Sequence, residues 1–366
     1  MKVVTTKEKF LNGILLTERV TGKKETLPVL SSILLSVGTK VMTLQATNLE
    51  AGIEVTIPVE VGEKGVIAVP ATIISQTIRS IGVEKITLIV EDGNLIIESK
   101  GTRTVIKGVP HDEFPVLSAD TSNVKGDVVS REELIYGIQA VSYAASPSMI
   151  RPELGSVYFS IRSTGVTCVA TDSFRLAEKT TGRDSGNGVE ILIPLKHTLE
   201  LLHILEHITD TQVKVFTGES QLTVSGEGVR FISRIVDGAF PNYKEIIPKN
   251  FTTEATLLKN DFSDVLKKAR VFSGNDQYVG LHVYPKRKIF SATARSADVG
   301  EMSDSIDAAL SGDDLDINFH IGYLADCLAT VESDSVILGF SGAGKPVVIH
   351  GASDTSFTYL VMPLNR

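Results

Sequence analysis

Tryptophan is absent from the 366 residues of this chain, and only 6% of them are aromatic. Proteins that bind single-stranded nucleic acid stack its bases on aromatic side chains, so this composition argues against that class. The only cysteines are Cys168 and Cys327, too few for a disulfide framework and typical of a reducing compartment. No apolar run reaches the roughly 18 residues of a membrane-spanning helix, and the N-terminal MKVVTTKEKFLNG lacks the apolar core of a secretory signal. We therefore expect a cytoplasmic protein without a membrane partner.

An excess of positive charge is also lacking. The chain holds 36 basic and 44 acidic residues, which gives a formal net charge of −8. This balance excludes a basic coat over the whole surface, as general nucleic-acid binders have, but it leaves room for a local basic surface. The length predicts two or three domains with sizeable cores.

Three kinds of sequence landmark recur at a spacing of about 124 residues, which is the size of a domain and too long for a solenoid unit. The first closes a strand-like stretch, at 44–48, 168–172 and 290–294. The second is an amphipathic segment of helical period, at 69–81, 193–205 and 319–331. The third has the pattern of a hairpin, at 85–99, 212–226 and 335–351.

Each unit is also predicted to open with a helix. These opening helices are expected over Lys7–Thr17, Arg131–Tyr143 and Lys259–Phe272. The sequence therefore predicts an α+β fold made of three copies of one domain. The expected domains are 1–122, 123–250 and 251–366, with boundaries in polar stretches.

One segment, GFSGAGKP at 339–346, nearly matches the phosphate loop GxxxxGK[ST]. Its last residue is Pro346, which lacks the hydroxyl that holds Mg²⁺, and the apolar residues that follow predict a strand rather than a helix. We interpret the segment as a hairpin turn. A nucleotide-binding enzyme remains the alternative.

The segment HILEH at 203–207 matches the inverted zinc-protease pattern HxxEH. Both histidines lie on one face of the predicted helix, as ligands four residues apart should. The second-segment helices of the other two units carry no such pair, so we interpret it as part of a polar face that includes Lys196 and Glu200. The expected apolar stripe of this helix is Leu195, Leu199, Leu202 and Leu205.

The remaining carboxylates do not form a convincing catalytic set. Asp313, Asp314 and Asp316 lie in one short run, which is typical of a solvated turn, whereas two-metal chemistry needs carboxylates from separate elements. Asp172 is better explained as the cap of a turn beside Arg175 than as a catalytic acid. We predict no catalytic residue, no cofactor and no metal. A hydrolase that uses 203–207 and a monomeric three-domain scaffold are the rival hypotheses.

Several longer motifs together resemble the bacterial sliding clamp, the β subunit of DNA polymerase III. They follow in the family's order along the whole chain and are IRPEL at 150–154, TDSFRLA at 171–177, VDGAFPNY at 236–243 and VMPL at 361–364, with TLPVL at 26–30 and ATNLE at 46–50. The resemblance implies three DNA-clamp domains per chain and a head-to-tail dimer. Six domains then form a ring around duplex DNA, with helices inside and sheets outside.

By the same resemblance, the chain is not an enzyme but a processivity factor in DNA replication. Its implied partners are a second copy of itself, double-stranded DNA without sequence specificity, the catalytic subunit of the replicative polymerase, a clamp loader, repair polymerases and mismatch-repair factors. In the cytoplasm of a bacterium it would associate with the nucleoid during replication.

The resemblance also assigns residues to three surfaces. The implied peptide pocket is Arg151, Leu154, Thr171, Ser173, Phe174, Arg175, Leu176, Pro241, Ile246, Tyr323, Pro346, Val361, Met362, Pro363 and Leu364. The expected DNA-facing cations are Lys24, Arg79 and Lys196. The expected dimer interface is Lys100, Arg103, Ile106, Lys107, Val271, Phe272, Asp298, Glu301 and Asp304.

Several positions depart from the family pattern, among them Phe174 and Pro152-Glu153. Phe174 stands where many clamps have histidine, and Pro152-Glu153 stand where some carry aromatic residues that touch DNA. We expect an altered peptide preference from the first departure.

Overall fold

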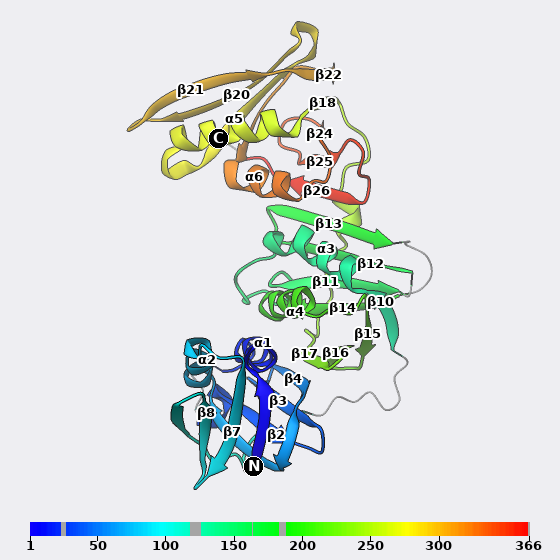
Figure 1. Ribbon diagram of the computed structural model, residues 1–366. Coiled ribbons are helices and arrows are strands. Elements are labelled where there is room, and N and C mark those ends of the chain that lie inside the picture. Colours follow the sequence, from blue (N-terminus) through cyan, green and yellow to red (C-terminus); the bar gives the residue numbers. More distant parts are fainter. Residues whose placement is uncertain (23–26, 118–125, 163, 183–187, 365–366) are drawn as a thin grey trace. The chain divides into compact units, whose positions relative to one another are not determined.

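The computed structural model describes residues 1–22, 27–117, 126–162, 164–182 and 188–364 (Figure 1). The chain divides into two compact units. Unit 1 comprises Met1–Glu132 and Leu199–Ile235, and unit 2 comprises Glu133–Thr198 and Val236–Arg366. The second predicted repeat therefore contributes to both units. None of the helices in the described ranges is long and apolar enough to cross a membrane.

The helices confirm the repeat. The three opening helices are α1 (Lys7–Glu18), α3 (Arg131–Val141) and α5 (Lys259–Phe272). The three later helices are α2 (Ala71–Ser80), α4 (Leu195–His207) and α6 (Ile321–Thr330). Each opening helix begins at the predicted residue, and α3 ends two residues early because Tyr143 lies in a short 3₁₀ turn.

Unit 1 holds two antiparallel sheets. The five-stranded sheet has the order β5 (Glu60–Glu63), β1 (Lys2–Thr6), β7 (Lys85–Glu91), β8 (Asn94–Ser99) and β9 (Thr102–Lys107). The eight-stranded sheet has the order β10 (Asp127–Ser130), β15 (Gln212–Thr217), β16 (Gln221–Gly226), β17 (Val229–Arg234), β4 (Ala51–Pro58), β3 (Val41–Thr47), β2 (Ser32–Val37) and β6 (Gly65–Pro70). Within the larger sheet, β17 of the second repeat pairs with β4 of the first, with Phe231 opposite Ile53.

Unit 2 repeats this arrangement. Its nine-stranded sheet has the order β14 (Val189–Pro194), β11 (Ser156–Arg162), β12 (Gly165–Thr171), β13 (Arg175–Gly182), β26 (Phe357–Val361), β25 (Val347–Gly351), β24 (Ser335–Phe340), β18 (Thr253–Leu258) and β22 (Ala308–Gly312). Its four-stranded sheet has the order β21 (Gly300–Ile306), β20 (Ile289–Ser296), β19 (Tyr278–Tyr284) and β23 (Leu315–His320). Here β13 of the second repeat pairs with β26 of the third, with Ala177 opposite Tyr359.

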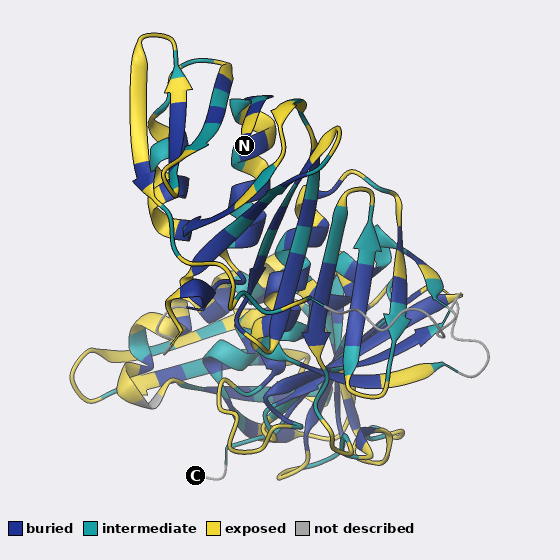
Figure 2. Cartoon of the chain, turned by 90° about the horizontal axis from the view of Figure 1, so that it is seen from below, coloured by how far each residue is buried: buried dark blue, intermediate teal, exposed yellow. Residues whose placement is uncertain are grey.

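The strands that the three repeats share follow the same order, and in the described residues only the second repeat lacks a counterpart of β5 and β22. β4, β13 and β21 hold equivalent places, and so do β9, β17 and β26. The hairpins predicted at 85–99, 212–226 and 335–351 are β7–β8, β15–β16 and β24–β25. Buried residues run along the strands, whereas hairpin turns are mostly exposed (Figure 2). Each repeat thus places its helices and its core by the same pattern.

The predicted apolar stripe of α4 is wrong in part. Leu205 is fully buried, but Leu199 is 43% exposed, and Glu200 of the supposed polar face is buried. The buried positions include Leu201, Ile204 and Leu205, so the helix is rotated from the predicted orientation. Leucine content alone did not identify the buried face, because the leucines of this helix point to several of its sides.

Candidate partner-binding site

The turn between β12 and β13 is fixed by the side chains of its first two residues. Thr171 donates from Oγ1 to the Arg175 carbonyl at 2.7 Å. Asp172 Oδ1 accepts from the backbone N–H groups of Phe174 at 2.9 Å and Arg175 at 3.0 Å. The prediction that Asp172 caps a turn is therefore confirmed. Ser173 takes a positive φ of 80°, and the Phe174 side chain is left exposed.

The first repeat builds the same turn. Asn48 Oδ1 accepts from the backbone N–H groups of Glu50 at 3.0 Å and Ala51 at 2.7 Å, and Leu49 has a φ of 74°. Asn48 and Asp172 both belong to the first sequence landmark. In these two copies of the landmark a short side-chain acceptor stabilises the turn, whereas the third copy ends in Ala294, which has no such acceptor.

Arg175 joins the second repeat to the third. Its Nε donates to Asp172 at 2.9 Å, its Nη1 donates to Asp326 on α6 at 2.7 Å, and its guanidinium lies 4.4 Å from the centre of the Tyr323 ring. Burial would lower the pKa of Arg175, but Tyr359, Asp326 and Asp172 raise it above its usual range. The guanidinium is therefore a permanent charge held on three sides. Sequence reasoning missed Asp326 because no motif marks this residue.

The C-terminal segment lies beside this turn. Val361 is paired with Arg175 across β26 and β13, and the Met362 N–H donates to the Phe174 carbonyl at 2.8 Å. The Leu364 N–H donates to the Asn318 carbonyl at 2.8 Å. Residues that are almost 190 positions apart in the sequence are thus brought together, as the resemblance implies.

A pocket of about 550 Å³ opens next to this segment. It is lined by Ile246, Pro248, Lys249, Asn250, Ser341, Gly344, Lys345, Pro346 and Met362. Three of these, Ile246, Pro346 and Met362, were predicted, and Ile246 exposes its apolar side chain. Beneath lies a buried cluster of Val169, Leu176, Tyr243 and Leu360, against which Met362 packs. The pocket combines an apolar wall with the cations Lys249 and Lys345.

The other predicted pocket residues do not line this cavity. Leu154 is buried and its N–H donates to the Arg151 carbonyl at 3.0 Å, while Arg151 itself pairs with Glu153 at 3.0 Å. The Pro241 carbonyl accepts from the Tyr243 N–H at 2.7 Å. Lys249 and Lys345 were missed because no motif marks either residue and their place at the cavity depends on tertiary packing.

The motifs that resembled enzyme sites have structural explanations. The 339–346 segment connects β24 to β25 as a hairpin, as predicted, so no helix follows that would direct its N-terminus at a phosphate. Asp316 accepts from the Tyr284 hydroxyl at 2.6 Å and lies 2.6 Å from Nδ1 of His282. Both cysteines are free and buried.

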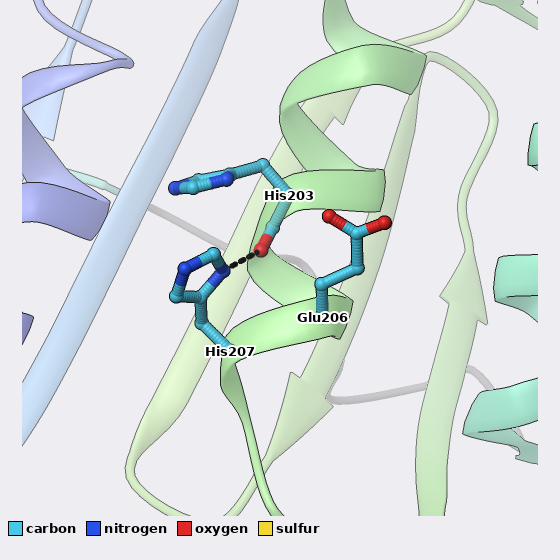
Figure 3. Close-up of side chains that lie close together, drawn as sticks. All are labelled: His203, Glu206 and His207. Carbon is cyan, nitrogen blue, oxygen red and sulfur yellow. Dashed lines mark hydrogen bonds between the residues drawn. The ribbon is translucent and has the colours of Figure 1, made fainter.

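The histidine pair of α4 does come together with an acid. One ligand atom each of His203, Glu206 and His207 lies within 4.8 Å of the others (Figure 3). The imidazole centres are 4.0 Å apart, and Nδ1 of His207 donates to the His203 carbonyl at 2.7 Å. Burial, and then the charges of Arg19 and His207, lower the pKa of His203.

The expected DNA-facing residues fall on the later helices of the first and second repeats. Arg79 is in the last turn of α2 and Lys196 in the first turn of α4, and both are exposed. Lys24 lies outside the described residues.

The expected dimer-interface residues lie on or beside the edge strands β9 and β21, or at the end of α5. Within the chain, Arg103 pairs with Glu91 at 3.1 Å and Asp304 with Lys268 at 2.7 Å. Lys100 precedes β9, and Lys107 is its last residue. Asp298 precedes β21, and Glu301 lies within it. Val271 and Phe272 are the last two residues of α5.

One interface residue needs correction. Ile106 is only 4% exposed, because the strand alternation directs its side chain into the chain's own core, so it cannot supply an apolar contact to a partner. The neighbouring Val105 is 51% exposed.

Three repeats of a two-helix domain, joined by sheets that continue across the repeat boundaries, define a DNA-clamp architecture. Family models place the chain more narrowly. The N-terminal, central and C-terminal domains of the DNA polymerase III beta subunit match residues 1–118, 128–242 and 244–365. The chain belongs to this family of sliding clamps, which serve DNA replication as processivity factors and are not enzymes.

Individual relatives agree along the whole length. The chain is 25% identical to the beta sliding clamp of Staphylococcus epidermidis over 375 residues, covering all of this chain and 99% of that one. It is 27% identical to the clamp of Vibrio cholerae over 348 residues, covering 94% of each. The crystal structure of the DNA polymerase III beta subunit of Thermotoga maritima is similar with a TM-score of 0.94 at 25% identity, covering all of this chain and 99% of that one.

Proposed function

We propose that two copies of this chain associate head to tail into a ring that encircles duplex DNA and tethers the replicative polymerase. The proposed domains are 1–122, 123–250 and 251–366. The observation that carries this proposal is the way in which the sheets cross from one repeat to the next.

A ring of such repeats needs three kinds of junction: first repeat to second, second to third, and third to first. The chain itself forms two of them. β4 of the first repeat pairs with β17 of the second, and β13 of the second pairs with β26 of the third. The equivalent strands that are left over are β21 and β9, and each is the last strand of its sheet. Pairing β21 of one copy with β9 of another repeats the same junction, and two such contacts close a ring.

Charge supports this contact. Residues 1–120 carry 13 basic and 14 acidic groups, whereas residues 251–366 carry 10 and 15. The acidic excess is thus in the third repeat, and Lys100 and Lys107 on the first repeat offer opposite charge. Complementary surfaces favour the head-to-tail pairing over the pairing of like ends.

A ring holds DNA by topology, so strong contacts to the bases are unnecessary. Contacts to the phosphate backbone are independent of sequence and permit sliding. We assign this role to Arg79 and Lys196. The net charge of −8 then belongs to surfaces that do not touch DNA.

The pocket beside Met362 is the proposed attachment site for partners. Its apolar wall suits short peptides with leucine or phenylalanine anchors, and Lys249 and Lys345 suit acidic residues in such peptides. The polymerase subunit, the clamp loader, repair polymerases and mismatch-repair factors would share it. Tethering raises the effective concentration of the polymerase at the primer end.

Sedimentation equilibrium tests the assembly. The expected mass is twice the 39.4 kDa of the chain. A chain that sediments as a monomer at micromolar concentration would contradict the ring.

A further inference from the structure

We propose that His203, Glu206 and His207 form a binding site for a divalent transition metal, with Zn²⁺ as the representative ion. The three residues lie on the last two turns of α4 (Figure 3). The helices α2 and α6 of the other repeats carry no such histidine pair. The site is argued from the geometry of the three side chains on α4.

The helix brings the three ligands to one place. Residues three and four positions apart are neighbours on a helix surface, which is the relation of Glu206 and His207 to His203. One ligand atom of each lies within 4.8 Å of the others, and rotation of side chains at the surface brings such atoms to the 2.0–2.2 Å bond lengths of zinc. Both imidazoles extend to the same side of the helix, with ring centres 4.0 Å apart (Figure 3).

A hydrogen bond prepares His207 as a ligand. A carbonyl oxygen only accepts, so the 2.7 Å contact between the His203 carbonyl and Nδ1 of His207 places the ring proton on Nδ1. The lone pair is then on Nε2, which is free to bind a metal. Histidines that ligate metals are commonly oriented in this way by a carbonyl on the other ring nitrogen.

The donor set defines the class of ion. Two imidazoles and one carboxylate favour Zn²⁺ and metals of similar preference, such as Ni²⁺ or Cu²⁺, over Mg²⁺ and Ca²⁺, which prefer oxygen ligands. The carboxylate offsets part of the charge of the ion, whereas Arg19 opposes it. Three protein ligands on a solvent-accessible helix leave a coordination position open for water or another small ligand. We therefore expect reversible binding rather than a structural zinc.

Calorimetric titration of the full chain with zinc chloride, after treatment with a chelator and buffer exchange, tests the site. One ion per chain is expected, with the affinity reduced about tenfold or more in His203→Gln and in His207→Gln. Glu206→Gln is expected to weaken binding by a smaller factor. His111→Gln is the matched control, because His111 is exposed and lies outside this cluster.

Two results would overturn the proposal. One is the absence of heat from zinc binding in the wild-type chain at millimolar zinc. The other is equal affinity in the wild type and in the double variant His203→Gln, His207→Gln, with circular dichroism showing that the double variant is folded. Zinc binding requires neither the ring nor DNA, so a failed dimer test leaves this result interpretable by itself.

Discussion

The carboxylate of Asp326 accepts a hydrogen bond from Arg175 at 2.7 Å, and this contact links α6 of the third repeat to the first residue of β13 in the second. Arg175 is also held by Asp172 at 2.9 Å, and its backbone is opposite Val361 in the shared sheet. The ionic contact and the sheet therefore fix the same junction from two sides. The pocket beside Met362 adjoins this junction, because the Met362 N–H donates to the carbonyl of Phe174, the residue before Arg175.

The two carboxylates should not contribute equally at this junction. The Arg175 and Asp172 side chains are largely buried, whereas Asp326 is about half exposed. We expect Asp172→Asn to lower the free energy of unfolding by about 3 kcal/mol, because it removes the buried partner of the Arg175 charge, and Asp326→Asn to lower it by about 0.5–1 kcal/mol, because that contact is half exposed. Urea denaturation of the three proteins measures this, and equal losses would contradict the unequal burial.

The proposed attachment of peptides at the pocket beside Met362 predicts a local effect of changing this residue. This residue lines the cavity and packs on the Leu176 and Tyr243 cluster, so Met362→Asp should weaken the binding of a leucine- and phenylalanine-containing peptide by about tenfold or more. Fluorescence anisotropy of a labelled peptide gives the affinity. Val116→Asp is the control, since Val116 is 89% exposed and outside this pocket. Unchanged affinity in Met362→Asp would refute the assignment.

The edge strands predict a second set of variants. Val105→Glu on β9 and Val271→Glu at the end of α5 add charge to exposed apolar side chains, and burying such a charge in an interface is costly. Each should convert dimers to monomers at micromolar concentration without unfolding the chain. Ile106 is unsuitable because it is buried in its own core. Sedimentation velocity measures whether each variant is a dimer or a monomer. The control Val116→Glu should stay dimeric, and a dimer in both test variants would reject this interface.

Acid should weaken a contact between β13 and the loop before β26. Asp354 accepts from Lys179 at 3.0 Å and from the Ser356 N–H at 2.8 Å. Burial alone would raise the pKa of Asp354, but the hydrogen bonds from Ser356 and Lys179 outweigh it and lower that pKa. Because the folded-state pKa is below the unfolded value near 3.9, the contribution is complete at neutral pH and is lost as the pH falls through the folded value.

The variant Asp354→Asn separates this effect from general acid unfolding. We expect it to be less stable than the wild type by about 1–2 kcal/mol at pH 7, and the difference should shrink as the pH falls from about 5 toward 3. Urea midpoints across this range give the difference. A difference for Asp354→Asn that stays constant with pH would contradict the account.

The sequence identified the repeats because each landmark has a local physical cause. The turn that Asn48 and Asp172 cap, and the period of the later helices, are both properties of short segments. The pairing of β4 with β17 joins strands far apart in sequence, and no local pattern selects such a partner. It could be expected only from the resemblance.

The candidate site, like the fold, could be predicted from the sequence only in part. The resemblance assigns Met362 and Ile246, but the cations Lys249 and Lys345 and the contact between Arg175 and Asp326 depend on tertiary packing. Two other expectations are wrong about which way a side chain points. Leu199 is exposed on α4, whose leucines point to several sides of the helix. On the edge strand β9, Ile106 is buried and Val105 is exposed.

Encirclement of DNA is tested most directly by cutting the DNA. The chain is loaded by a clamp loader onto a nicked circular plasmid, separated from free protein, and the plasmid is then linearised at one restriction site. The account predicts that protein stays on the circle and leaves the linear DNA through its ends, because topology alone retains it. Equal retention on circular and linear DNA would contradict the ring.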